Sequence, residues 1–217
     1  SYHDEKELGP AFAKTTDGQG KEAGFTSRGE NFNKEEYKKL LSNIKVVGIG
    51  ECGLDYYRCT PESISKQKEV FIQQIELANE FKKPLMLHIR NAYKDALEIL
   101  KKYLNLESLP AGRRGNAHFF AGKWVEAKAF LDFGFTLSFT GVITFTHDYD
   151  EVVRNTPLDM IMSETDSPYV APVPYRGKRN EPAYVREVVK KIAEIKNLTE
   201  DEVAAAIIEN ARRVFTF

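Results

Sequence analysis

The chain has 217 residues, of which 42% are hydrophobic and 29% are charged. These proportions are typical of a folded globular protein and exclude a disordered or low-complexity chain. The 31 Lys and Arg residues almost balance the 32 Asp and Glu residues, so no overall basic field favours non-specific duplex binding. Two cysteines are too few for a disulfide framework and indicate a reducing compartment, and no apolar run approaches the ~20 residues of a membrane span. We therefore expect one domain over 1–217, a cytoplasmic location and no membrane partner.

Regular hydrophobic patterns follow an irregular head. Residues 1–34 are rich in Gly, Lys, Thr, Asp and Glu and have neither a helical nor a strand period, which predicts a loop-like head. Over 35–217, short apolar runs alternate with amphipathic stretches. The apolar runs predict strands at 46–50, 85–89, 116–120, 135–139 and 160–164. The amphipathic stretches predict helices at 60–83, 96–103, 123–133, 149–155, 181–195 and 200–214.

Strand–helix units in series predict an α/β fold with a parallel sheet and helices outside it. A doubly wound sheet and a closed barrel both fit this alternation. The glycines Gly48, Gly50 and Gly53 spell the G-x-G-x-x-G pattern of a dinucleotide site. That site needs a helix to open directly at the glycines, whereas the predicted helix begins only near Pro61, and the carboxylate of Glu51 would repel a diphosphate. The pattern therefore gives little support to a Rossmann fold.

Reactive side chains fall at the carboxyl ends of successive predicted strands. Glu51 follows the first strand, His88 closes the second, His118 lies in the third, and Asp166 follows the fifth. In an α/β barrel these ends meet at one face, where active sites form. Any one of these residues alone is more often a cap or a core residue. Together they suit a divalent metal ion, because buried charge is costly unless it is paired or metal-bound.

Two further features lie near the last of these strands. Glu164 shares a strand face with Asp166, so it is a candidate either to ligate the ion or to support a ligand. A short basic cluster, 176–179, follows Asp166 in the same loop, and beside a metal ion it would suit a phosphate group.

Four sequence blocks carry a resemblance to a known family. They are Gly-Glu-Cys-Gly-Leu-Asp-Tyr-Tyr at 50–57, Pro-Leu-Met-Leu-His-Ile-Arg at 84–90, His-Phe-Phe-Ala-Gly at 118–122, and Glu-Thr-Asp-Ser-Pro-Tyr at 164–169 with Arg-Gly-Lys-Arg-Asn-Glu-Pro at 176–182. Over 35–217 the chain resembles the TatD family of metal-dependent deoxyribonucleases. The resemblance implies a TIM-like (β/α)8 barrel of the metal-dependent hydrolase type that cleaves DNA, at ends or in single strands.

The resemblance also implies roles for individual residues. Up to two divalent ions (Mg, Mn or Zn) would lie at the site, with Glu51 bridging them. His88 and His118 would bind one ion, and Asp166 would bind the other and orient the attacking water. Arg90 and Arg179 would face the phosphate of the substrate.

One family feature has no counterpart here. Family members begin with a strand that carries His-x-His, and this sequence contains no His-x-His. We therefore expect a barrel that is incomplete at its N-terminus, at most one firmly held ion, and feeble hydrolysis. A related metal-dependent hydrolase of another ester or amide, or an inactive fragment, are the alternatives to a deoxyribonuclease.

Overall fold

The computed structural model describes residues 32–217, so the predicted head at 1–34 lies almost wholly outside the described residues. The first described element is α1 (Lys34–Leu41), which the sequence patterns did not predict. Asn33 caps this helix by accepting hydrogen bonds from the first-turn backbone N–H groups. Acidic residues in the first turn and lysines in the last turn suit the helix dipole. Only Leu41 is buried, so the usual apolar stripe is too weak to detect.

The strands form a single parallel sheet, as predicted, in the order β1-β2-β3-β4-β5. The strands are β1 (Ile49–Asp55), β2 (Leu85–Arg90), β3 (Gly115–His118), β4 (Thr136–Phe139) and β5 (Ile161–Ser163). A doubly wound sheet reverses its strand order at a switch point, whereas this sheet adds each strand beside the preceding one. The order is that of a barrel wall.

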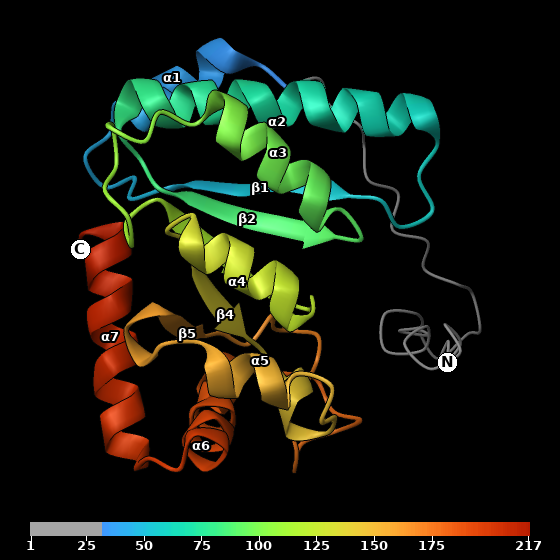
Figure 1. Cartoon of the computed structure of the whole chain (residues 1–217), viewed down its shortest axis with the longest axis vertical. Helices are drawn as coiled ribbons and strands as arrows, with labels where there is room; N and C mark the ends of the chain where they lie inside the picture. Colours follow the sequence, from blue (N-terminus) through green and yellow to red (C-terminus); the bar gives the residue numbers. More distant parts are fainter. Residues whose placement is uncertain (1–31) are drawn as a thin grey trace.

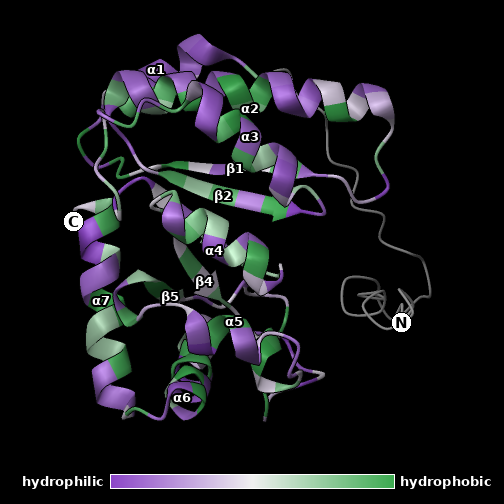
Figure 2. Cartoon of the chain, in the orientation of Figure 1, coloured by the Kyte–Doolittle hydropathy of each residue, from purple (hydrophilic) through white to green (hydrophobic). Residues whose placement is uncertain are grey.

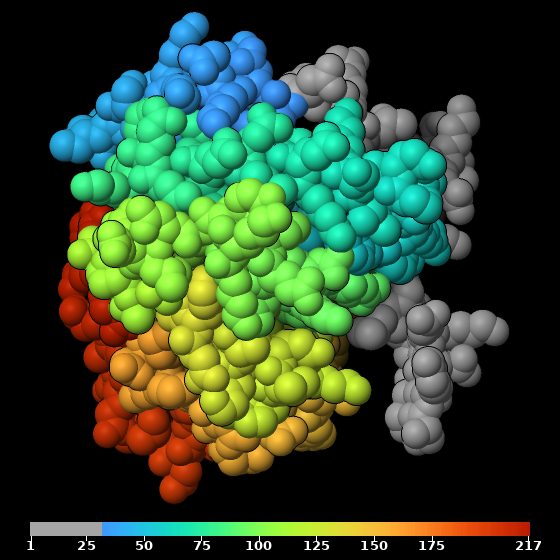
Figure 3. All heavy atoms as spheres, turned by 45° about the horizontal axis from the view of Figure 1, so that its top comes forward, coloured from blue at the N-terminus to red at the C-terminus, as the bar shows by residue number. Residues whose placement is uncertain are grey.

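Helices alternate with the strands and pack against them (Figure 1). They are α2 (Pro61–Phe81), α3 (Tyr93–Tyr103), α4 (Trp124–Asp132), α5 (Asp150–Asn155), α6 (Val185–Lys196) and α7 (Glu200–Phe215), with short 3-10 turns at Gly141–Thr144, Leu158–Met160 and Pro182–Tyr184. In Figure 2 the long helices carry hydrophilic and hydrophobic residues side by side, the two-faced pattern of helices that cover a sheet. Figure 3 shows successive segments crossing the surface in chain order, from α1 and α2 to the C-terminal helices.

The predicted helix starts near residues 60 and 200 are confirmed. Thr60 accepts a hydrogen bond from the backbone N–H of Ser63, and Thr199 forms a capping box with Glu202. The predicted bounds of the first strand, 46–50, are wrong, because β1 covers Ile49–Asp55. Its register with β2 shifts between Ile49 and Cys52 and then continues to Asp55. Glu51 therefore lies inside the strand rather than after it.

The core lies between the sheet and its helices. Phe71 and Ile75 of α2, Leu85 and Leu87 of β2, and Phe130 of α4 are fully buried. Each such side chain stabilises the fold by about 1.5–3 kcal/mol relative to an exposed position. This packing fixes the strands, and so it fixes the relative positions of the side chains at their carboxyl ends. Within residues 32–217, no helix has both the length and the apolar character that crossing a bilayer requires.

Candidate metal centre

Three neighbouring strands bring the predicted nitrogen and oxygen ligands together. His88 of β2 and His118 of β3 are register partners, and their ring centroids are 6.2 Å apart. His88 is also the register partner of Gly53 in β1, and Glu51 lies two residues before that glycine. Because side chains two apart on a strand share a face, Glu51 projects beside both rings.

The resulting distances suit a metal ion. The Oε1 atom of Glu51 lies 2.7 Å from Nδ1 of His88 and 3.4 Å from Nε2 of His118. One candidate ligand atom from each of the three residues lies within 4.8 Å of the others. A carboxylate with two imidazoles is a donor set that divalent ions such as Zn²⁺ and Mn²⁺ accept. The residues present therefore fit one such ion.

Asp166 lies at the edge of this cluster, in the loop after β5. Its Oδ1 atom is 3.9 Å from Nε2 of His118, so both Glu51 and Asp166 approach the same ring nitrogen. The backbone of Asp166 is left-handed, with φ of 54°, a conformation that aspartate tolerates better than most residues. The loop turns directly after it, where the N–H of Tyr169 donates to its carbonyl oxygen. The predicted convergence of Glu51, His88, His118 and Asp166 thus describes the geometry of the structure.

Glu164 supports His118 from the opposite side of the ring. Its carboxylate contacts Nδ1 of His118 and accepts hydrogen bonds from the backbone N–H of Phe119 at 2.7 Å and from the hydroxyl of Ser138. Ser138 in turn accepts from the side-chain amide of Asn116. A carboxylate on the outer nitrogen fixes both the tautomer and the orientation of a ligating imidazole. Of the two roles predicted for Glu164, the geometry favours support of a ligand.

The pKa values of these groups are shifted because several charged side chains lie close together. The hydrogen bond with His88 lowers the pKa of Glu51, and the same bond raises the pKa of His88. Burial works against the charged form of His118, but the contacts with Glu164 outweigh it and raise the pKa of His118. Burial and the neighbouring carboxylates of Glu164 and Glu51 raise the pKa of Asp166. More carboxylates than imidazoles meet here, and this excess of negative charge favours binding of a cation.

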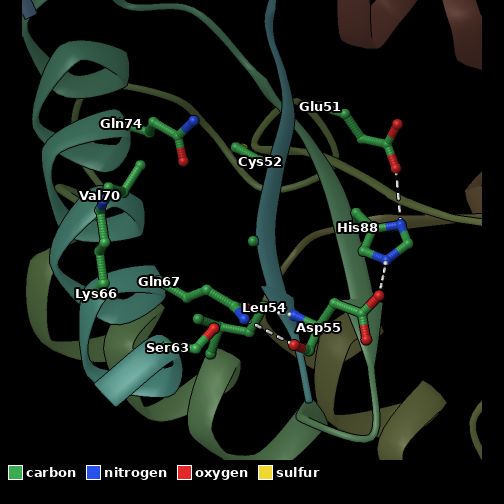
Figure 4. Close-up of a pocket in the computed structure, with 11 residues that line it drawn as sticks. Glu51, Cys52, Leu54, Asp55, Ser63, Lys66, Gln67, Val70, Gln74 and His88 are labelled. Atoms are coloured by element: carbon green, nitrogen blue, oxygen red, sulfur yellow. Dashed lines mark hydrogen bonds and ion pairs between the residues drawn. The ribbon is translucent and has the colours of Figure 1, made fainter. Parts of the chain in front are cut away.

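Asp55 also borders the site, and the sequence patterns did not single it out. Its Oδ2 atom lies 3.4 Å from Nε2 of His88, on the side of the ring opposite Glu51 (Figure 4). A cavity of about 530 Å³ between β1 and α2 is bordered by Glu51, Asp55 and His88. The signal that could have identified Asp55 is its spacing of four residues from Glu51, which places both on one face of a continuous strand.

The two predicted phosphate contacts lie on different elements. Arg90 is the last residue of β2, and its guanidinium lies 3.8 Å from the ring centroid of Tyr57. Arg179 is exposed in the long loop after β5. The next residue, Asn180, is buried and donates hydrogen bonds to the carbonyl oxygens of Thr165 and Tyr169. These bonds fix the backbone beside Arg179 to the loop that carries Asp166.

The fold and the ligand set define a barrel-type α/β protein with a candidate metal centre at the carboxyl ends of its strands. The family model of TatD related DNases matches residues 13–216, and the chain belongs to that family. It is 38% identical over 191 residues to the uncharacterized metal-dependent hydrolase YcfH of Escherichia coli K12, covering 87% of this chain and 70% of that protein. It is 43% identical over 181 residues to the uncharacterized metal-dependent hydrolase YabD of Bacillus subtilis, covering 82% and 68%.

Solved structures agree with this assignment. The crystal structure of YjjV, a TatD homolog from Escherichia coli K12, superposes with a TM-score of 0.77 at 27% identity, over 85% of this chain and 70% of that one. An uncharacterized amidohydrolase from Saccharomyces cerevisiae superposes with a TM-score of 0.71 at 18% identity, which shows the shared fold alone. The predicted TIM-like barrel class is confirmed.

Proposed function

We propose that this protein is a metal-dependent deoxyribonuclease that hydrolyses phosphodiester bonds of DNA, at ends or in single strands. The observation that carries the proposal is the meeting of Glu51, His88 and His118 within 4.8 Å, beside Asp166. Membership of the TatD family supports DNA as the substrate. We assign Glu51, His88 and His118 as ligands of a divalent ion (Mg, Mn or Zn).

Different side chains of the site are assigned different roles in the hydrolysis. A bound divalent ion supplies Lewis-acid activation of a water molecule and of the phosphodiester oxygens. Glu51 and the two imidazoles hold the ion, and Glu164 keeps Nε2 of His118 directed into the site. Asp166 reaches the same place, and we assign its Oδ1 atom the roles of orienting the attacking water and accepting its proton.

The arginines are proposed to bind the substrate. A guanidinium presents a planar fork of donors that matches a phosphate group better than an ammonium does. Tyr57 stacks against Arg90 and so limits the conformations of its long side chain. Arg179 lies on a loop that buried Asn180 anchors, so the position of its backbone relative to Asp166 is defined.

The proposal is tested with Asp166→Asn. The amide keeps the size of the side chain but removes its charge and its ability to accept a proton. In a version of the protein that also carries the His-x-His strand of the family, we expect nucleotide release from end-labelled single-stranded DNA to fall at least ~100-fold, the magnitude typical of losing a general base. Asp132→Asn, on the exposed end of α4 where Asp132 pairs with Lys128, is the matched control and should keep full activity.

Two results would overturn the assignment. One is wild-type cleavage by the Asp166→Asn variant. The other is a wild-type protein that, loaded with Mn²⁺ or Zn²⁺, leaves DNA intact but hydrolyses carboxylic ester or amide substrates. The second outcome would keep the metal centre and replace the substrate.

A further inference from the structure

We infer that Asp55 is a positioning residue that orients His88 for metal binding, and that Gln67 of α2 fixes Asp55 in place. The inference rests on the metal centre of the proposed function but not on the identity of its substrate. It assigns His88 the same kind of support that Glu164 gives His118, from a different strand and through the other ring nitrogen.

The ring of His88 lies between two carboxylates. Nδ1 is 2.7 Å from Oε1 of Glu51, and Nε2 is 3.4 Å from Oδ2 of Asp55 (Figure 4). Only Nδ1 faces the cluster, so it is the nitrogen available to an ion. Binding through Nδ1 requires its lone pair, which places the ring proton on Nε2. Asp55 is positioned to accept that proton in a hydrogen bond and so selects the tautomer that binds metal.

Asp55 itself is fixed by contacts on three sides. The side chain of Gln67 forms two hydrogen bonds with the backbone of Asp55. It accepts from the N–H of Asp55 at 2.8 Å and donates to the carbonyl oxygen of Asp55 at 2.8 Å. The other carboxylate oxygen, Oδ1, accepts from the backbone N–H of Tyr57 at 2.8 Å. With Oδ1 occupied, Oδ2 is the oxygen directed at His88. Gln67 thus ties the end of β1 to α2 at the residue that contacts the ring.

The occupied oxygen makes Asp55→Asn a sharp test. Asparagine forms the same turn, because its single amide oxygen can accept from the N–H of Tyr57. Its NH₂ group then faces Nε2 of His88 and donates to it, which favours the tautomer with the ring proton on Nδ1 and so weakens metal binding through that nitrogen. A purely structural Asp55 predicts that asparagine is harmless. A positioning Asp55 predicts loss of metal affinity in a folded protein.

The primary measurement is the affinity for Zn²⁺ alone, determined by competition with a chromogenic chelator. We expect Asp55→Asn to weaken Zn²⁺ binding by about 10- to 100-fold, as is usual when a ligand loses its outer-shell partner. Its melting temperature without metal should stay close to that of the wild type. Asp132→Asn removes the same charge at a distant position and should leave Zn²⁺ affinity unchanged.

A second measurement follows the ring proton itself. In Zn²⁺-loaded, ¹⁵N-histidine-labelled protein, the Nε2 proton of His88 should exchange slowly in the wild type and rapidly in Asp55→Asn. The Nδ1 proton of His118, held by Glu164, is an internal reference that should not change. Gln67→Ala leaves the carboxylate in place but frees the end of β1, and it should weaken Zn²⁺ binding by a smaller factor.

The outcomes separate the two levels of the hypothesis. Wild-type Zn²⁺ affinity together with an unchanged Nε2 proton in Asp55→Asn would overturn the role of Asp55. Wild-type affinity in Gln67→Ala would overturn the part assigned to Gln67. A wild-type protein that fails to bind Zn²⁺ would overturn the metal centre, and with it both roles.

Discussion

The two imidazoles of the site have contrasting surroundings. His118 is 12% exposed, and the carboxylate that holds it, Glu164, is 22% exposed and bonded to Ser138 and to the backbone of Phe119. His88 is 40% exposed, and its neighbours Glu51 and Asp55 are 52% and 38% exposed. The half around His118, here called the core half, is mostly buried. The half around His88, here called the exposed half, is more open to solvent and lies beside β1, which pairs with β2 alone among the described strands.

This contrast separates stability from ligand binding. A buried hydrogen-bonded network is costly to break, because each lost partner leaves a desolvated polar group unpaired. Exposed charges interact weakly, since water screens them and replaces a missing partner. We therefore expect changes around His118 to affect both folding and metal binding, and changes around His88 to affect mainly metal binding.

The largest expected effect is on the free energy of unfolding. Glu164→Ala removes the acceptor shared by His118, Phe119 and Ser138. Because this pair is only partly buried, we expect a loss of about 3 kcal/mol, the lower end of the cost of breaking a buried ion pair. Glu51→Ala removes the same charge from the exposed half and should cost less than about 1 kcal/mol. Urea unfolding of both metal-free variants gives the two values. Equal losses would contradict the division of the site into a core half and an exposed half.

A second prediction concerns the pH dependence of the metal-free protein. The folded-state pKa values of His88 and His118 are raised, mainly through Glu51 and Glu164. A raised histidine pKa adds stability that is complete below the ordinary value of about 6.5 and is lost as the pH rises through the folded value. We therefore expect the free energy of unfolding to fall as the pH increases above about 6.5.

The same experiment compares the two halves. His118→Gln should flatten this pH dependence more than His88→Gln, because water screens the exposed pair of His88 more strongly. Urea unfolding over a pH series, with a chelator present, gives the slopes. A larger change in His88→Gln would show that the exposed pair carries the pH dependence.

The same contrast explains what the sequence could predict. The convergence of His88, His118 and Asp166 follows from their positions at or just after the carboxyl ends of parallel strands. Glu51 joins them from inside β1, because the register of this strand places Gly53 beside His88. The role of Asp55 does not follow from the patterns, because the predicted strand covers only 46–50 and Gly53, a residue type depleted in strands, gives no sign that the strand continues. Once β1 extends to Asp55, the alternation of side chains places Asp55 on the same face of the strand as Glu51.

The contacts of a long side chain such as Arg90 are a second feature that sequence patterns do not predict. Arg90 closes β2 as its position predicts, but its stacking on Tyr57 depends on rotamers that several neighbours determine together. The sequence patterns also did not predict α1, because they detect apolar stripes. Its caps and charges, rather than an apolar stripe, define it.

The smallest effect is expected at Arg179, which is exposed on the loop that leads from the core half of the site. Arg179→Ala should weaken binding of single-stranded DNA. The slope of the logarithm of the DNA-binding constant against the logarithm of the salt concentration should become smaller by about one unit, as expected for one lost phosphate contact. Its melting temperature should be nearly unchanged, because Asn180, not Arg179, carries the hydrogen bonds that fix this part of the loop. Lys178→Ala is the control for charge alone, since Lys178 is also exposed and lies one residue away. An equal change in salt dependence in both variants would indicate a diffuse basic surface instead of a specific contact. A large fall in melting temperature with DNA binding retained would make Arg179 a structural residue, and the assignment of phosphate binding would then rest on Arg90 at the exposed half.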